Sequence, residues 1–263
     1  MMNARPPAVA GLFYPAEPDV LRGEVARYLA EAQEFPYRPK ALIVPHAGYI
    51  YSAPIAASAY RLLEPLGGQI SRVVLLGPAH RVWVRGLALP GVEAFDTPLG
   101  TIPLDREAMD AIAGLPQVET LTAAHAREHS LEVQLPFLQE VLGTFKLVPL
   151  VVGGATPQEV AEVLERLWGG DETLIVVSSD LSHYLPYQAG GHVDKATARA
   201  ILDLRTDLVG EQACGAHPIN GLLLAARHHG LRPHLLDLRN SGDTAGDRDR
   251  VVGYGAFAFT ETQ

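Results

Sequence analysis

The sequence has almost no cysteine and no long apolar run. Cys214 is the single cysteine among 263 residues, which excludes an intrachain disulfide and fits a reducing compartment. No stretch approaches the roughly 18 to 20 apolar residues that a membrane-spanning helix needs. The N-terminus also lacks the apolar centre of a secretory signal. We therefore expect a cytoplasmic protein that does not enter a membrane.

Positive charge is scarce as well. Lys and Arg total 21 against 30 Asp and Glu, so the formal net charge is −9. Nucleic acids and anionic membranes need a basic face, so neither is expected as the main partner. The sequence also lacks a glycine-rich loop of the dinucleotide-binding or P-loop kind. What it does contain is 48% hydrophobic residues in a chain long enough for a substantial core, which predicts a globular fold.

Apolar runs typical of buried strands alternate along the chain with stretches of helical periodicity. The strand-like runs are residues 41–44, 72–76, 146–152, 174–177, 235–238 and 251–259. No internal repeat and no low-complexity linker divides the chain. This pattern predicts a single α/β domain over residues 1–263, with a largely parallel or mixed sheet flanked by helices. Shorter strands between residues 86 and 104 are expected as an antiparallel addition.

Three of the strand-like runs each lead to a histidine just past their end. Pro45 ends the run 41–44, because proline cannot donate to a sheet, and His46 comes next. His80 and His183 follow two further runs in the same way. Open α/β sheets place their ligand crevice at the carboxyl ends of the strands. The repeated arrangement therefore predicts one site that the three histidines share.

His46 and His80 are the foremost candidates for metal ligands, because imidazole suits iron, copper, zinc and nickel. Asp243 is the candidate for a third ligand, since its loop follows the strand-like run 235–238. Two histidines and one carboxylate form the facial arrangement typical of non-haem Fe(II). The alternatives stay open: either histidine alone can be a hydrogen-bonded structural residue, and Asp243 alone can be a turn residue that bonds its own backbone.

Asp180 and His183 lie three residues apart, so on a turn they face the same way. A carboxylate that bonds an imidazole fixes its tautomer and raises its pKa, which suits a general base. We therefore predict His183 as the acid/base group, oriented by Asp180. His183 as a metal ligand and Asp180 as a helix cap are the alternatives.

Two further segments combine residues that bind metals or act as nucleophiles. Glu128, His129 and Glu132 resemble a metal-binding helix without the His-Glu-x-x-His spacing, so we expect them to support a metal site or to cap a helix. Cys214 and His217 could form a nucleophile pair. Their separation by three residues across a glycine favours a structural or pocket-lining role instead.

Several motifs in the same order resemble the Memo family, whose bacterial and archaeal members are called AmmeMemoRadiSam system protein B. That family is similar in fold to class III extradiol ring-cleaving dioxygenases, which are non-haem Fe(II) enzymes. The motifs that carry the resemblance are residues 11–15 (GLFYP), 45–52 (PHAGYIYS), 76–80 (LGPAH), 128–132 (EHSLE), 177–184 (VSSDLSHY), 214–219 (CGAHPI), 241–243 (SGD) and 252–254 (VGY).

The resemblance implies that His46 and His80 bind a metal, that Asp243 takes the third position, and that His183 beside Asp180 is the acid/base histidine. It implies Fe(II) first, with copper or zinc as alternatives. The family name implies radical-SAM and AMMECR-type proteins as candidate partners. The residues expected to line the substrate pocket are Tyr49, Tyr51, His129, Tyr184, Cys214 and His217.

The leading hypothesis is therefore a metal-dependent redox enzyme of extradiol-dioxygenase type, acting on a small molecule that the sequence does not identify. One alternative is a binding or signalling protein that uses the same pocket for recognition. Another is a hydrolase in which zinc activates water.

Overall fold

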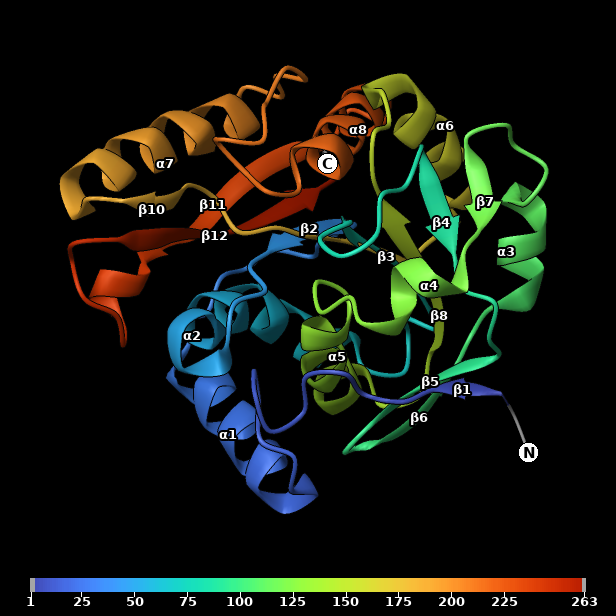
Figure 1. The fold of residues 1–263 in the computed structure, drawn as a ribbon, viewed down its shortest axis with the longest axis horizontal. Helices are drawn as coiled ribbons and strands as arrows, with labels where there is room; N and C mark the ends of the chain where they lie inside the picture. The colour runs from blue at the N-terminus through green and yellow to red at the C-terminus, as the bar shows by residue number, and fades with distance from the viewer. Residues whose placement is uncertain (1–2, 262–263) are drawn as a thin grey trace.

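The structure, a computed structural model, describes residues 3–261. Its centre is a nine-stranded mixed sheet with helices on both faces (Figure 1). Four adjacent central strands are parallel: β2 (Ala41–Val44), β9 (Thr173–Ser178), β3 (Arg72–Pro78) and β8 (Lys146–Val152). Such strands are covered on both faces, which explains why their sequences are continuous apolar runs. The predicted α/β fold with a largely parallel or mixed sheet is confirmed.

Shorter or antiparallel strands complete the sheet on both sides. On the β2 side, β12 (Val251–Thr260) pairs with β2, and β11 (Arg232–Asn240) and β10 (His183–Leu185) pair with β12. Beside β8 lie β4 (Leu87–Leu89) and β7 (Val118–Thr120). A separate small sheet contains β1 (Ala4–Arg5), β5 (Ala94–Thr97) and β6 (Gly100–Pro103). The region 86–104 therefore divides, with β4 in the main sheet and the β5–β6 hairpin in the small one.

Two layers of helices cover the sheet. One layer contains α1 (Pro18–Glu31), α2 (Tyr49–Tyr60) and α5 (Leu135–Leu142). The other contains α3 (Arg106–Ile112), α6 (Pro157–Leu167), α7 (Tyr187–Leu202) and α8 (Ala216–His228), as Figure 1 shows. The short α4 (Thr122–Ala126) precedes the loop of residues 127–131. Within residues 3–261, no helix is both long and apolar enough to cross a membrane.

The alternation of strand side chains explains why there are two cores. Leu42 and Val44 of β2 point into the core under α1, α2 and α5, while Ala41 and Ile43 point into the core on the opposite face. All four side chains are fully buried. Three 3-10 helices connect the regular elements: Arg61–Leu66, Glu132–Gln134 and Ser241–Asp243.

The parallel strands bring the polar segments that follow them to one edge of the sheet. In the β2–β9 register Val44 lies opposite Ser178, and in the β3–β9 register Leu76 lies opposite Val177. The residues that follow β2, β3 and β9 therefore emerge side by side. This is the edge at which an open α/β sheet carries its ligand crevice.

Candidate metal centre

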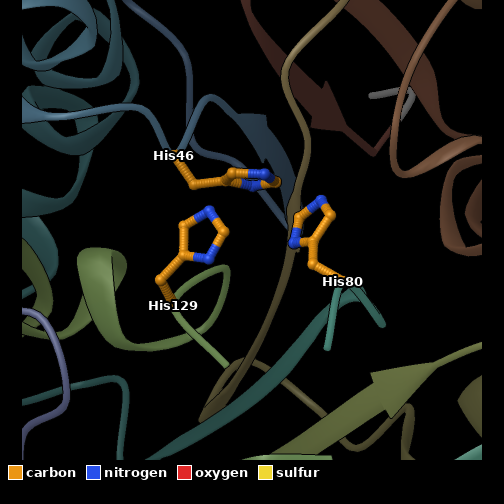
Figure 2. A group of neighbouring side chains, drawn as sticks. All are labelled: His46, His80 and His129. Atoms are coloured by element: carbon orange, nitrogen blue, oxygen red, sulfur yellow. The ribbon is translucent and has the colours of Figure 1, made fainter. Parts of the chain in front are cut away.

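Three histidines from three separate segments face one another (Figure 2). His46 follows β2, His80 follows β3, and His129 comes from the loop after α4. One ring nitrogen of each lies within 4.8 Å of the corresponding nitrogens of the other two. The ring centroids are 5.3 Å apart for His46 and His80, 5.4 Å for His46 and His129, and 4.8 Å for His80 and His129. This group is a candidate centre for a metal ion.

His46 is held by the core of the sheet. Its Nδ1 lies 2.8 Å from the hydroxyl oxygen of Ser178. That hydroxyl donates its only proton to the carbonyl of Ser130 at 2.6 Å, and it accepts a second hydrogen bond from the amide of Gln134 at 2.7 Å. The hydroxyl can therefore only accept from His46, so Nδ1 carries the proton and Nε2 keeps its lone pair. Burial lowers the pKa of His46 well below its usual value, so the ring is neutral.

His80 is held by the carboxylate of Glu128. Nδ1 of His80 lies 2.9 Å from Oε1, and the backbone N–H of His80 donates to Oε2 at 2.7 Å. Ser130 donates its backbone N–H to Oε1 at 2.9 Å. Burial raises the pKa of Glu128, but the His80 side chain and these backbone N–H groups outweigh it and hold the pKa at about 2. A carboxylate behind Nδ1 leaves Nε2 of His80 as a ligand atom.

His129 completes the group and has the least support of the three. Its Nδ1 is buried, lies 3.4 Å from Oε1 of Glu128, and makes no hydrogen bond among the described residues. The ring packs 4.8 Å from that of Phe13. Burial lowers the pKa of His129 to about 4, so this imidazole is also neutral near pH 7.

The donor set fits a late first-row transition metal. His46 and His129 are neutral, and His46 and His80 each have Nδ1 occupied by a hydrogen bond, so Nε2 of each is the nitrogen that can bind a metal. Three imidazoles suit iron, copper, zinc or nickel and leave further coordination positions for other ligands. The side chain of His80 is 28% exposed, so small molecules can reach the group from that side.

Asp180 lies next to His46 but does not bond to His183. Its carboxylate accepts the backbone N–H of His46 at 2.7 Å. Burial raises the pKa of Asp180 to about 7, although hydrogen bonds from the His46 and Ala47 backbones oppose the rise. His183, at the start of β10, is partly buried, and burial lowers its pKa. His183 is close enough to affect His46 electrostatically, so it belongs to the surroundings of the centre.

Cys214, another predicted pocket residue, lies beside His46. Its Sγ is 3.4 Å from Nε2 of His46, the nitrogen that Ser178 leaves free. Burial, and secondly the charge of Asp180, raise the pKa of the thiol to about 12, so it is protonated without a metal. A thiol that coordinates a metal loses its proton, so Cys214 is a potential fourth donor.

Asp243 does not lie with the histidines. It ends the 3-10 helix Ser241–Asp243, and its Oδ2 accepts the backbone N–H of Asn240 at 3.0 Å. Its Oδ1 accepts the hydroxyl of Tyr187. Asp243 thus caps its own turn, and among the described residues the group of converging donor atoms contains His129 and not Asp243. The sequence signal for His129 was its position beside Glu128, which was interpreted as support for the metal rather than as a ligand.

The other predicted pocket residues differ in burial. Tyr49 is in the core, where its hydroxyl donates to the carbonyl of Val133 at 2.9 Å. His217 lies at the surface of α8, with Nδ1 2.8 Å from the carbonyl of Ala155. Tyr51 is partly buried in α2. Tyr184 is 62% exposed, next to His183 at a β-bulge, and its φ of +59° is unusual for a residue other than glycine.

A cavity of about 580 Å³ lies at the opposite end of the sheet, where Lys40 and Thr173 precede or begin the parallel strands. None of the site histidines lines it. The histidine centre is thus defined by converging donor atoms rather than by the size of a cavity.

The fold and the three histidines define a mixed α/β protein with a candidate metal centre at the carboxyl edge of its sheet. The family profile described as Memo-like protein matches residues 5–258, and the chain belongs to the Memo family. A MEMO1 family protein of Ignicoccus hospitalis is 37% identical, covering 98% of this chain and 99% of its relative. A MEMO1 family protein of Aquifex aeolicus is 36% identical, covering 98% of this chain and 100% of its relative.

A solved structure shows the same fold at greater distance. It is an uncharacterized protein of Escherichia coli K12, which matches with a TM-score of 0.51 and 13% identity. The match covers 83% of this chain and 99% of that one. The predicted Memo membership is confirmed.

Proposed function

We propose that this protein is a metal-dependent redox enzyme of the extradiol-dioxygenase type, with Fe(II) held by His46, His80 and His129. The observation that carries the proposal is the convergence of three ring nitrogens within 4.8 Å, on imidazoles supported from behind by Ser178 and Glu128. Iron, when bound, supplies redox chemistry with dioxygen at the positions that three protein ligands leave open.

The residues of the chain supply the proton chemistry. Burial lowers the pKa of His183, so its imidazole is neutral near pH 7 and can accept a proton from a substrate hydroxyl. Asp180 has a pKa of about 7 and can hold or release a proton in the same pH range. The Asp180 carboxylate is held by the backbone N–H of His46, and it does not orient the His183 ring.

A zinc-dependent hydrolase is the second candidate, and one observation favours it. Three histidines with an open position are a ligand set of catalytic zinc, whereas a carboxylate in the third place is more typical of Fe(II). The presence of His129, and not Asp243, in the group of converging donors therefore favours this alternative. Zinc lowers the pKa of bound water, and such an enzyme would work without oxygen.

Metal content tests the proposal. The protein would be purified anaerobically without an affinity tag, as wild type and as the His129→Ala, Asp243→Ala and His192→Ala variants. His192 is the control, because it pairs only with its own helix at the carbonyl of Gln188. We expect near-stoichiometric iron in all but His129→Ala, and oxygen uptake when catechol-type compounds are added.

The other outcomes separate the alternatives. Stoichiometric zinc with oxygen-independent hydrolysis would favour the hydrolase. Wild-type protein without any metal would overturn both enzymes and leave the histidine group as a recognition pocket. Iron that is lost in Asp243→Ala and retained in His129→Ala would restore the ligand set implied by the family resemblance.

A further inference from the structure

The segment before α1 reaches across the molecule to the loop that carries His129. We call residues 4–14 the N-terminal arm and residues 125–132 the His129 loop. The arm begins as β1, which pairs with β5, and it is the blue segment that leads to α1 in Figure 1. The two segments are more than 100 residues apart in sequence, and buried polar contacts join them.

Arg5 ties both the start and the middle of the His129 loop to the arm. The side chain of Arg5 is 4% exposed. Its Nε donates to the carbonyl of His125 at 2.6 Å, and its Nη2 donates to the carbonyl of Glu128 at 2.8 Å. Its Nη1 forms an ion pair with Glu132 at 2.8 Å. The three nitrogens of one planar guanidinium thus bond to three points of the loop.

Glu132 fixes the end of the same loop. Its side chain is fully buried. It accepts the backbone N–H groups of Ala8 at 2.8 Å and Val9 at 2.9 Å, and the hydroxyl of Tyr14 at 2.6 Å. With Arg5, these contacts satisfy the carboxylate through the arm alone. The conformation of the loop therefore depends on the arm being docked.

The residues between these anchors include His129 itself and Glu128, the carboxylate that holds His80. Glu128 holds the ring and the backbone N–H of His80, and His129 is its neighbour. Phe13 of the arm packs on His129, with 4.8 Å between the ring centroids. His46 is supported by Ser178 of β9, whose hydroxyl in turn donates to the carbonyl of Ser130 in the His129 loop. The arm thus holds the loop that carries His129 and that contacts His80 directly and His46 through Ser178.

We propose that Arg5 is a positioning residue of the metal centre, and that docking of the N-terminal arm and binding of metal are thermodynamically coupled. The inference rests on the proposed function only in requiring that the three histidines bind a metal. Coupling is reciprocal: if the docked arm raises the affinity for metal, bound metal must stabilise the docked arm by the same factor.

The first test is the affinity for Zn(II) and Co(II), measured by chelator competition on metal-free protein. Arg5→Lys keeps the charge but cannot reach all three acceptors, and Arg22→Lys is the matched control at the exposed pair with Glu140. Supporting groups behind metal ligands are typically worth 10- to 100-fold in affinity. We expect at least roughly tenfold weaker binding and an altered visible Co(II) spectrum for Arg5→Lys, with no change for Arg22→Lys.

A milder variant keeps the test decisive if Arg5→Lys does not fold. Tyr14→Phe retains the buried ring and removes only the hydroxyl that donates to Glu132. We expect a smaller loss of affinity in the same direction. Circular dichroism would establish that each variant has the wild-type fold before its metal affinity is compared.

The second test measures the reciprocal effect, which a purely structural role would not produce. Hydrogen exchange in peptides covering residues 4–14 would be followed by mass spectrometry, with and without Zn(II). We expect slower exchange with metal in wild type and a smaller difference in Arg5→Lys. Unchanged arm exchange, or wild-type affinity in a folded Arg5→Lys, would overturn the coupling. Wild type that binds no metal would overturn the proposed function as well, and is a distinct result.

Discussion

Two buried carboxylates flank the histidine group, and their pKa values shift in opposite directions. Glu128 is 1% exposed and has a pKa of about 2, while Asp180 is 5% exposed and has a pKa of about 7. Each accepts the backbone N–H of a site histidine at 2.7 Å. Burial raises both pKa values, so the difference also depends on the groups that oppose burial at each carboxylate.

The partners beyond that shared hydrogen bond explain it. Glu128 also receives the ring nitrogen of His80 and the backbone N–H of Ser130. At Asp180 the effect of burial on the pKa is opposed, in decreasing order, by the backbone N–H of His46, the electrostatic effect of His80 and the backbone of Ala47. A buried carboxylate is thus kept ionised when an imidazole and several N–H groups bond to it, and it retains a proton near pH 7 when they do not. The first suits support of a ligand, and the second suits proton exchange.

The largest expected effect that tests this comparison is the pH dependence of Asp180→Asn. The pKa of Asp180 lies above its usual 3.8 in the folded protein, so its contribution to stability is present below about pH 4 and is lost as the pH rises through about 7. The unfolding free energy of wild type minus that of the variant should therefore fall by about 4 kcal/mol across this range, at about 1.4 kcal/mol per pKa unit. Urea unfolding near pH 4 and near pH 8 measures it.

If the unfolding free energies of wild type and Asp180→Asn changed equally with pH, the raised pKa of Asp180 would be contradicted. Such a result would mean that water or a cation keeps this carboxylate ionised in the folded state. Asparagine retains the oxygen that accepts the His46 N–H, so loss of that hydrogen bond does not confound the result.

For Glu128→Gln the difference in unfolding free energy should change with pH in the opposite direction. The folded pKa of about 2 lies below the usual 4.5, so the contribution of Glu128 is present above about pH 4.5 and disappears as the pH falls toward 2. The advantage of wild type over the variant should shrink by about 3 kcal/mol over that interval. Chemical unfolding near pH 5.5 and near pH 3 would detect most of the change. An advantage that grew toward low pH would contradict the assignment.

Metal affinity at neutral pH should separate the two carboxylates again. Glu128→Gln weakens the acceptor behind Nδ1 of His80, so we expect affinity for Zn(II) to fall about 10- to 100-fold, or about 1.4 to 2.7 kcal/mol. Asp180→Asn should change it far less, because Asp180 contacts His46 only through the backbone. Competition titrations on both variants provide the measurement. Equal losses would show that Asp180 acts on the ligands directly.

The edge of the sheet was predictable from sequence because parallel strands impose it. β2, β3 and β9 are short apolar runs that must be buried on both faces, and their ends coincide at one edge. His46 and His80 follow those ends within two residues, so their convergence required no knowledge of side-chain contacts. The alternation of strands and helices was equally visible, because each face of the sheet needs its own apolar layer.

The third histidine was not predictable in the same way. His129 lies on a loop whose position depends on Arg5 and Glu132, in contacts that span more than 100 residues. Nothing in its local sequence distinguishes a ligand from a supporting residue. The sequence pattern favoured Asp243 as a ligand because it follows the long strand β11. In the structure its carboxylate bonds to the backbone of its own turn. The alternative interpretation of Asp243, a turn residue bonding its own backbone, is the one that the structure contains.

The smallest expected effect is therefore that of Asp243→Ala. Asp243 is exposed, and its removal takes away a cap on the backbone N–H of Asn240 and the partner of the Tyr187 hydroxyl. Loss of such a cap costs about 1 kcal/mol, which urea unfolding would detect against wild type. Affinity for Zn(II) should be unchanged, in contrast to Glu128→Gln, because no ligand or ligand support is removed. A loss of affinity comparable to that of Glu128→Gln would require this loop to move onto the histidines when metal binds, and would bring a third carboxylate into the comparison of Glu128 with Asp180.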